Sequence, residues 1–136
     1  MKIKSKFLLL AITIFFSQNS LAEKKIKMES PNEYNNYLFT DIKKVKPNVY
    51  RFWMEVEYKE DVDKEGRLEG EVVRRLHEID CNQATIKTIS IIEYNKDGDL
   101  IESMTRSGNQ IKTNHIVPDT YGEQHMNQVC NLKKNK

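Results

Sequence analysis

Two cysteines constrain this fold more than any other feature of the sequence. They are the only cysteines among its 136 residues, and they stand far apart, at positions 81 and 130. Cys81 ends a predicted strand, whereas Cys130 lies near the end of a predicted helix. If the two side chains pair, the bond ties a helix to a sheet across a long loop. In the chain-entropy model such a loop contributes roughly 4 kcal/mol, which is large beside the ~5–15 kcal/mol of a typical domain.

The first 22 residues have the composition of a targeting segment. Three lysines precede an apolar run at positions 7–16, and Ser20-Leu21-Ala22 places small residues where a signal peptidase reads them. This order predicts a secretory signal peptide over residues 1–22 that is cleaved after Ala22. The alternative is an uncleaved anchor, although the apolar run is shorter than the ~20 residues that span a bilayer. No cysteine immediately follows the cleavage site, so we expect an exported protein without lipid anchor or membrane span, in the periplasm or at the outer cell surface.

Cleavage also changes the charge of the chain. Residues 1–22 carry three lysines and no acidic residue, so their removal lowers the formal net charge from +2 to −1. A general electrostatic attraction to nucleic acid or to acidic membranes is therefore not supported. The remaining residues suffice for one domain with one modest core. We expect a polar, loosely docked leader over residues 23–33, followed by an α+β domain over residues 34–136.

The cysteines favour a structural role over a chemical one. Export places them in an oxidising compartment, where a structural disulfide is the default. Redox catalysis usually uses a Cys-x-x-Cys pair, which this sequence lacks. A zinc site would need two more ligands, and His77, His115 and His125 do not show the spacing of ligands.

The clearest strand covers residues 49–58. Apolar and aromatic side chains occupy every second position from Tyr50 onward, whereas charged residues such as Arg51 and Glu55 lie opposite them. One face of this strand therefore belongs to the core, and the other is mostly wet. Trp53 stands among the polar residues. It is either covered by the leader or exposed as a contact residue, and it is our one candidate binding residue.

The remaining patterns predict an α+β fold, with a single antiparallel sheet of about five to six strands packed by a C-terminal α-helix. The predicted strands cover residues 34–39, 49–58, 71–81, 85–94 and 100–105. Residues 85–94 are apolar on both sides, which is typical of a central strand or of one covered by a partner, such as a second copy in a homodimer. Thr120 and Glu123 predict a capping box at the start of the helix, with Glu123 reaching back to the amide of Thr120.

A charged loop over residues 59–70 contains several acidic residues and two glycines. Its composition suggests a calcium site, but its order does not match an EF-hand. Counted from Asp61, position six is Gly66, whereas position twelve is Val72 instead of glutamate. A solvated hairpin loop is the better interpretation, and no metal ligand is predicted.

Four short motifs occur between the long strand and the predicted helix. They are Tyr50-Arg51-Phe52-Trp53, Ile79-Asp80-Cys81, Glu93-Tyr94-Asn95-Lys96-Asp97-Gly98, and Ile116-Val117-Pro118-Asp119 before Glu123 and Val129-Cys130. In order and spacing, from about Tyr37 to Cys130, the chain resembles the surface-adhesin protein E family of Gram-negative bacteria. The resemblance implies an antiparallel sheet packed by a C-terminal helix, with Cys81 bonded to Cys130. It also implies adhesion, because members are associated with binding host matrix and serum proteins at the cell surface.

The sequence favours a binding protein over an enzyme. It lacks a Ser/His/Asp pattern, a glycine-rich nucleotide loop and a metal cluster, so no catalytic residue and no cofactor is predicted. We expect an adhesin-like module whose partners are host or envelope proteins. The alternative is a periplasmic inhibitor or envelope protein, for example of the lysozyme-inhibitor type, which would insert the charged loop into an enzyme.

Overall fold

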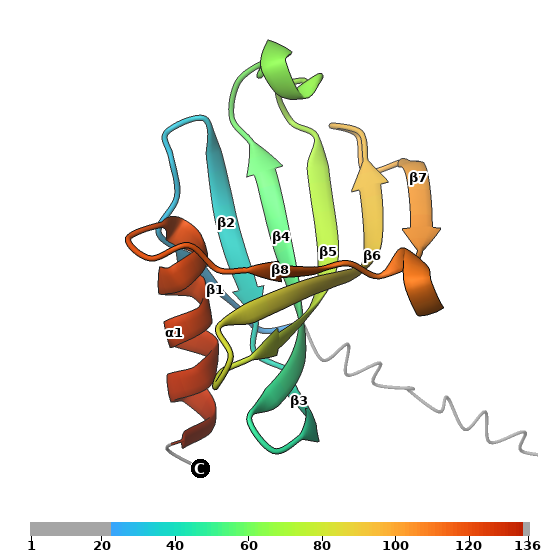
Figure 1. Ribbon diagram of the computed structural model, residues 1–136. Coiled ribbons are helices and arrows are strands. Elements are labelled where there is room, and N and C mark those ends of the chain that lie inside the picture. Colours follow the sequence, from blue (N-terminus) through green and yellow to red (C-terminus); the bar gives the residue numbers. More distant parts are fainter. Residues whose placement is uncertain (1–22, 135–136) are drawn as a thin grey trace, which may run out of the picture.

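The computed structural model describes residues 23–134, so the predicted signal peptide lies outside the described residues. The described residues form an antiparallel sheet and a long helix (Figure 1). The strands are β1 (Lys25–Met28), β2 (Tyr34–Phe39), β3 (Lys43–Lys46), β4 (Val49–Tyr58), β5 (Val72–Asp80), β6 (Thr85–Tyr94), β7 (Leu100–Thr105) and β8 (Thr113–His115). The helix is α1 (Tyr121–Lys134), and two short 3-10 turns are η1 (Asp63–Glu65) and η2 (Gly108–Gln110). Within this part of the chain, no helix is long and apolar enough to cross a membrane.

Two long strands organise the sheet. The main path follows the order β1–β2–β4–β5–β6–β7, while β3 pairs with β4 and β8 pairs with β6 off this path. The first residues of β4 face β3 and its later residues face β2. In the same way, the first residues of β6 face β8 and its later residues face β7. Each long strand therefore has two short neighbours on one side and β5 on the other.

A bulge in β6 separates its two halves. His77 pairs with Thr88 and Leu76 pairs with Ser90, so Ile89 is an extra residue opposite β5. Bulges bend a strand and increase its twist. In Figure 1 the first half of β6, which runs beside β8, accordingly takes a different direction from its second half.

The sheet has eight strands, so the prediction of five to six is wrong. The five predicted strands are present with nearly the expected bounds. The additional strands are β1, β3 and β8, which are only three or four residues long and mostly exposed. Main-chain hydrogen bonds to longer neighbours hold them, so their sequences carry little of the apolar alternation from which strands are predicted. β1 lies within the leader that we expected to be loosely docked, and it pairs with β2 along its whole length.

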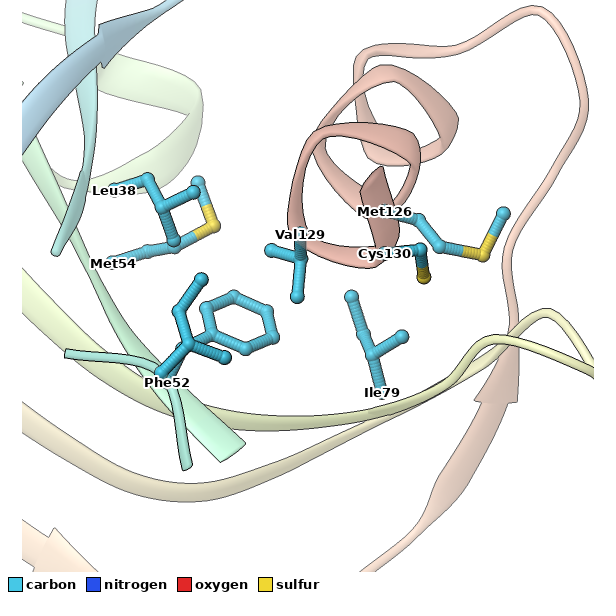
Figure 2. Close-up of a cluster of buried hydrophobic side chains, with 8 residues drawn as sticks. Leu38, Phe52, Met54, Ile79, Met126, Val129 and Cys130 are labelled. Carbon is cyan, nitrogen blue, oxygen red and sulfur yellow. The ribbon is translucent and has the colours of Figure 1, made fainter. Parts of the chain in front are cut away.

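Helix α1 covers one face of the sheet and closes the main core (Figure 2). Its buried side chains are Met126, Val129 and Cys130, and Val129 has no exposed surface. These side chains pack with Leu38 of β2, Phe52 and Met54 of β4, and Ile79 of β5. The apolar side of residues 49–58 is thus the core face, as predicted, with Phe52 only 1% exposed.

A smaller core lies on the same face under the charged loop. Val56 and Tyr58 of β4, Val62 of the loop and Val73 of β5 form it. The amide of Val62 donates to the carbonyl of Arg67 at 2.9 Å, which closes the loop around η1. Most of the loop is therefore solvated, and it is anchored to the sheet by the buried Val62 and by Arg67, which pairs with Glu93 of β6.

The start of α1 differs in one bond from the predicted capping box. The amide of Glu123 donates to Oγ1 of Thr120 at 3.4 Å, as expected. The carboxylate of Glu123, however, accepts its hydrogen bond from the amide of Asp119 at 2.9 Å, and not from that of Thr120. Asp119 has a φ of 59°, a left-handed conformation that Asp tolerates better than most residues. This turn presents the amide of Asp119 to the glutamate.

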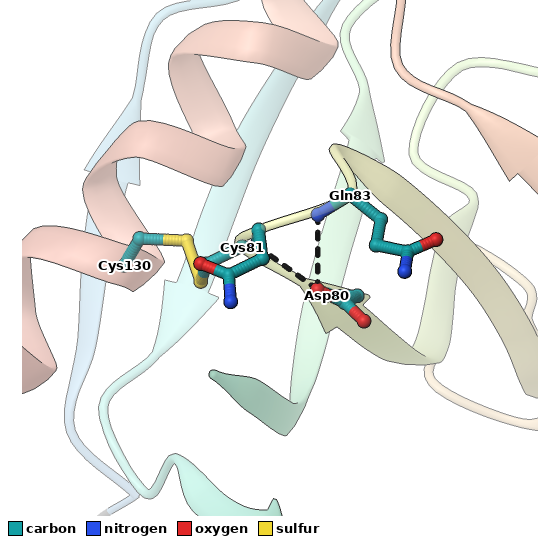
Figure 3. The surroundings of a disulfide bond; sticks show 5 residues. Asp80, Cys81, Gln83 and Cys130 are labelled. Atoms are coloured by element: carbon teal, nitrogen blue, oxygen red, sulfur yellow. Dashed lines mark hydrogen bonds between the residues drawn. A yellow bond between two sulfur atoms is a disulfide. The ribbon is translucent and has the colours of Figure 1, made fainter. Parts of the chain in front are cut away.

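Cys81 and Cys130 form a disulfide, with their Cα atoms 6.1 Å apart (Figure 3). Cys81 directly follows β5, in a turn closed by the side chain of Asp80. One oxygen of Asp80 accepts hydrogen bonds from the amides of Asn82 and Gln83, at 2.9 and 3.0 Å. The bond therefore joins α1 to an ordered turn at the end of a central strand.

Candidate binding surface

The sheet has a second face on the side opposite α1. We call it the open face and define it by Tyr37 and Phe39 of β2, Trp53 and Glu55 of β4, Arg74 and Leu76 of β5, and Ile92 and Tyr94 of β6. The strand register pairs Trp53 with Leu76, Glu55 with Arg74, and Arg74 with Ile92. Alternation along each strand thus gathers aromatic, apolar and charged side chains on one surface.

A buried carboxylate lies at the centre of the open face. The side chain of Glu55 is only 5% exposed. Its two oxygens accept hydrogen bonds from Nζ of Lys25 at 2.5 Å and from Nε of Arg74 at 2.8 Å. Burying an unpaired charge is very unfavourable, so these two cations are what allows Glu55 to lie inside the sheet.

The same two cations lie over aromatic rings. Nζ of Lys25 is 4.4 Å from the centroid of Tyr37. The guanidinium carbon of Arg74 is 5.3 Å from the ring centroid of Phe39 and 5.6 Å from that of Tyr94. Cations at such distances are attracted by the faces of the rings. Arg74 is therefore held by a carboxylate and two rings. Its side chain would lose little further conformational entropy on binding a partner.

A groove of about 600 Å³ lies beside Arg74 on the open face. Its apolar lining comes from Phe39, Trp53 and Ile92, which are buried or half-buried. Its charged lining includes Glu23, Lys24, Asp41 and Arg74. A groove of this kind can receive an apolar side chain of another molecule and hold neighbouring polar groups by charge.

Residues 25–131 match the profile of the family called surface-adhesin protein E. This chain belongs to the surface-adhesin protein E family. Among solved structures, that of Haemophilus influenzae protein E is similar with a TM-score of 0.53 and 17% identity, over 81% of this chain and 96% of that chain. Crystal form II of Haemophilus influenzae protein E gives a TM-score of 0.52 and 14% identity, over 82% of this chain and 99% of that chain. A comparison with curated proteins finds no match.

The family membership confirms the resemblance that the four motifs indicated. At the identities found, the likeness to the solved protein E structures concerns the fold alone. The surface-adhesin protein E family is a family of surface adhesins and not of enzymes, which agrees with an exported, adhesin-type protein.

Trp53 is the one residue of the open face that the sequence singled out in this member of the surface-adhesin protein E family. It is half-buried, and it shares its groove with Glu23 and Lys24 of the leader. The leader thus lies beside the ring and leaves part of it accessible, while a contact role for Trp53 stays a prediction. Sequence reasoning missed Glu55 and Arg74, because their contact depends on the register of two strands.

The histidines lie away from the open face. Burial lowers the pKa of His77 to about 4, and its Nδ1 lies 3.1 Å from the hydroxyl of Thr88. Burial also lowers the pKa of His125, whose Nε2 lies 3.1 Å from the carbonyl of Glu29. Within residues 23–134, no three His, Cys, Asp or Glu side chains are placed to hold a metal ion.

Proposed function

We propose that this chain is an exported adhesin-type protein that binds another protein through the open face, with Trp53 at the contact. The observation that carries the proposal is the groove in which Trp53 lies next to the fixed guanidinium of Arg74. Tryptophan and arginine are enriched among residues that dominate the energy of protein interfaces. Membership of an adhesin family supports host matrix or serum proteins as the class of partner.

The ion network favours binding by pre-organisation. An arginine that is free in solution loses side-chain entropy when a partner immobilises it, at a cost of about 0.5–1.5 kcal/mol. Arg74 is already held by Glu55 and lies over Phe39 and Tyr94, so much of this cost is met within the fold. An acidic group on the partner would therefore find a cation in a fixed position.

Binding to immobilised matrix and serum proteins tests this proposal. Trp53→Ala should weaken binding of the responsive partner by more than about tenfold, as expected for a central interface residue. Tyr121→Ala is the matched control, because Tyr121 is an exposed aromatic residue of α1, 43% accessible and on the other side of the sheet. Equal affinities of the two variants would show that the open face does not contact the partner.

The location of the protein distinguishes the adhesin from a periplasmic inhibitor. We propose display at the outer surface, so protease added to intact cells should degrade the protein. Protection in intact cells, with digestion only after the outer membrane is opened, would favour the inhibitor or another envelope role.

For the homodimer considered above, we propose β7 as the edge that pairs. It ends the main path of the sheet, and among residues 23–134 it pairs only with β6, so its other side can accept another strand. Leu100, Ile101 and Met104 of this strand are 60%, 52% and 40% exposed. Light scattering during gel filtration should give twice the monomer mass, and Ile101→Lys should return the monomer; a monomeric wild-type protein excludes the pairing.

A further inference from the structure

The face of the sheet under α1 is not filled along its whole length. Between the two core clusters, from α1 to the charged loop, lies a cavity of about 520 Å³. Tyr34 and Asn36 of β2, Arg75 of β5 and His125 of α1 contribute to its lining. Its volume falls within the ~300–1,000 Å³ of pockets that bind small molecules. It lies on the opposite side of the sheet from Trp53 and is separate from the groove of the open face.

Arg75 brings a positive charge to this cavity without a protein partner. Its neighbour Arg74 is bonded to Glu55, and Arg67, which also lines the cavity, donates two hydrogen bonds to Glu93. Within residues 23–134, Arg75 makes no side-chain hydrogen bond or ion pair, although it is half-buried. A half-buried guanidinium has donors in a planar fork that matches a carboxylate.

Asn36 is the second group that points to a ligand. It is only 5% exposed, and its side chain makes no hydrogen bond to any other described residue. Among the described residues, the side-chain atoms that are fully buried without a partner are Nε of Arg51 and Oε2 of Glu71, so the amide of Asn36 still reaches the open space of the cavity, where it can meet a polar ligand. The hydroxyl of Tyr34 is a further donor without a partner in this part of the chain. Burial raises the pKa of Tyr34, so this hydroxyl keeps its proton at neutral pH.

The remaining charges of the lining decide the kind of anion. Glu65 also lines the cavity, where its carboxylate accepts a hydrogen bond from the hydroxyl of Tyr58 at 2.9 Å. Arg67 is paired with Glu93, so the charges of the lining that remain are the positive Arg75 and the negative Glu65. Phosphate concentrates up to two negative charges on one small group, so Glu65 would repel it more strongly than a carboxylate group, which carries one charge. The balance favours one carboxylate on Arg75, with the rest of the ligand toward the amide and hydroxyl groups.

We propose that this cavity binds a carboxylate, which pairs with the guanidinium of Arg75 and accepts hydrogen bonds from Asn36 and Tyr34. The carboxylate belongs to a small organic acid or to an acidic side chain of a polypeptide, since both present the same planar group. This site does not depend on the open face and goes beyond the proposed adhesive contact.

Titrations followed by NMR test the proposal on ¹⁵N-labelled protein recovered from the periplasm of an expression host. The probes are glutarate as the small acid, N-acetylglutamate methylamide as the side chain, its glutamine analogue, and phosphate. Glutarate should shift the side-chain amide signal of Asn36 and the Nε–H signal of Arg75 in a saturable way. A response to the glutamate probe but not to the glutamine analogue assigns polypeptide side chains to the site as well, whereas glutarate alone restricts it to small acids.

Variants separate a specific site from general attraction. Arg75→Met should weaken glutarate binding by more than about tenfold, since it removes a charge-assisted pair. Lys46→Gln on β3 is the matched control, because it removes one positive charge at an exposed position and should leave binding unchanged. Should Arg75→Met fail to fold, Asn36→Asp places a competing carboxylate in the cavity and should weaken binding instead. The proposal would be overturned by saturable shifts that persist undiminished in Arg75→Met or Asn36→Asp, by phosphate binding as tight as glutarate binding, or by the absence of a saturable shift with any carboxylate probe.

Discussion

Adjacent residues of β4 contribute very differently to stability because they lie on opposite faces. Phe52 is 1% exposed, packs under α1, and lies 5.9 Å from the ring of His77 between centroids. Arg51 points to the other side, where it pairs with Glu78 at 2.7 Å and keeps 42% of its side chain exposed. This pair is only half-exposed, because the side chain of Glu78 is 13% accessible, and a hydrogen bond between charged groups contributes about 1.5–3 kcal/mol at most, less than a buried phenylalanine.

We therefore expect Phe52→Ala to lower the free energy of unfolding by about 3–5 kcal/mol, because it removes a buried ring and leaves a cavity. Arg51→Ala should lower it by about 1–2 kcal/mol, because Glu78 loses its hydrogen-bonded partner but keeps Lys87 at 3.9 Å. Denaturant unfolding of the two variants measures both changes. Similar midpoints for the two would show that the core face has been assigned to the wrong side.

His77 should make stability depend on pH below its ordinary pKa of 6.5. Its pKa falls from 6.5 to about 4 on folding, chiefly by burial, so below pH 6.5 the unfolded chain binds a proton that the folded chain does not. Stability should thus decrease as pH falls from about 6.5 to about 4, by at most about 3 kcal/mol at 1.36 kcal/mol per pKa unit. His77→Gln should flatten the curve of unfolding free energy in this range.

The carboxylates change the stability in a lower pH range than the histidines do, so their contribution can be measured separately. Hydrogen bonds from Arg67 lower the pKa of Glu93, so its contribution is lost only as pH falls below the ordinary carboxyl value of 4.5. Burial also lowers the pKa of His125, so His125→Gln measures its own share of the same decline. A decline in stability between pH 6.5 and 4 that survives when both histidines are replaced would have to come from other groups.

At the scale of elements, the long strands could be predicted and the short ones could not. β4 alternates between apolar and polar residues, and β6 is rich in Thr and Ile, so each carries its own signal. β3 has the sequence KKVK and is exposed at every position, so only its pairing with β4 defines it as a strand. The candidate site follows the same rule. Trp53 could be selected from the sequence by its residue type and its position among polar residues. A role for Arg74 and Arg75 can be proposed only once the strand register shows which side chains lie beside them.

Helix α1 is the element that should respond most to loss of the disulfide. Cys130→Ser removes a constraint worth roughly 4 kcal/mol in the chain-entropy model, and helices of this length are marginal on their own. Three of the helix side chains that the structure describes are buried, so amide protection in α1 should fall first and the sheet should outlast it. Hydrogen exchange on the variant decides this. Equal loss of protection in β5 and α1 would mean that helix and sheet unfold as one unit.

At the scale of the whole molecule, the sheet separates two proposed sites. The Trp53 groove and the Arg75 cavity lie on opposite faces, and distant sites usually behave additively. Trp53→Ala should therefore weaken protein binding and leave glutarate binding unchanged, while Arg75→Met should do the reverse. Parallel titrations of both variants against both probes measure this. A coupled loss in either variant would indicate a shared conformational change through the sheet.

Export is the second whole-molecule property open to test. If residues 1–22 are a signal peptide, the intact mass of the exported protein should correspond to a chain beginning at Glu23. Thiol titration of the same sample should find no free thiol, because Cys81 and Cys130 are joined. A retained Met1 would contradict the cleavage, and two reactive thiols would contradict oxidation in that compartment.

The bond between Cys81 and Cys130 also turns part of the chain into a closed covalent ring. β6, β7, β8 and the first turns of α1 lie inside this ring, whereas β1 to β5 lie on the linear segment before it. A protease that cuts once in the exposed stretch between β7 and β8 opens the ring without releasing a fragment. A single cut before Cys81 instead divides the molecule into pieces with no covalent link. Outside the cell, the C-terminal half of this protein can therefore be nicked and still remain one molecule.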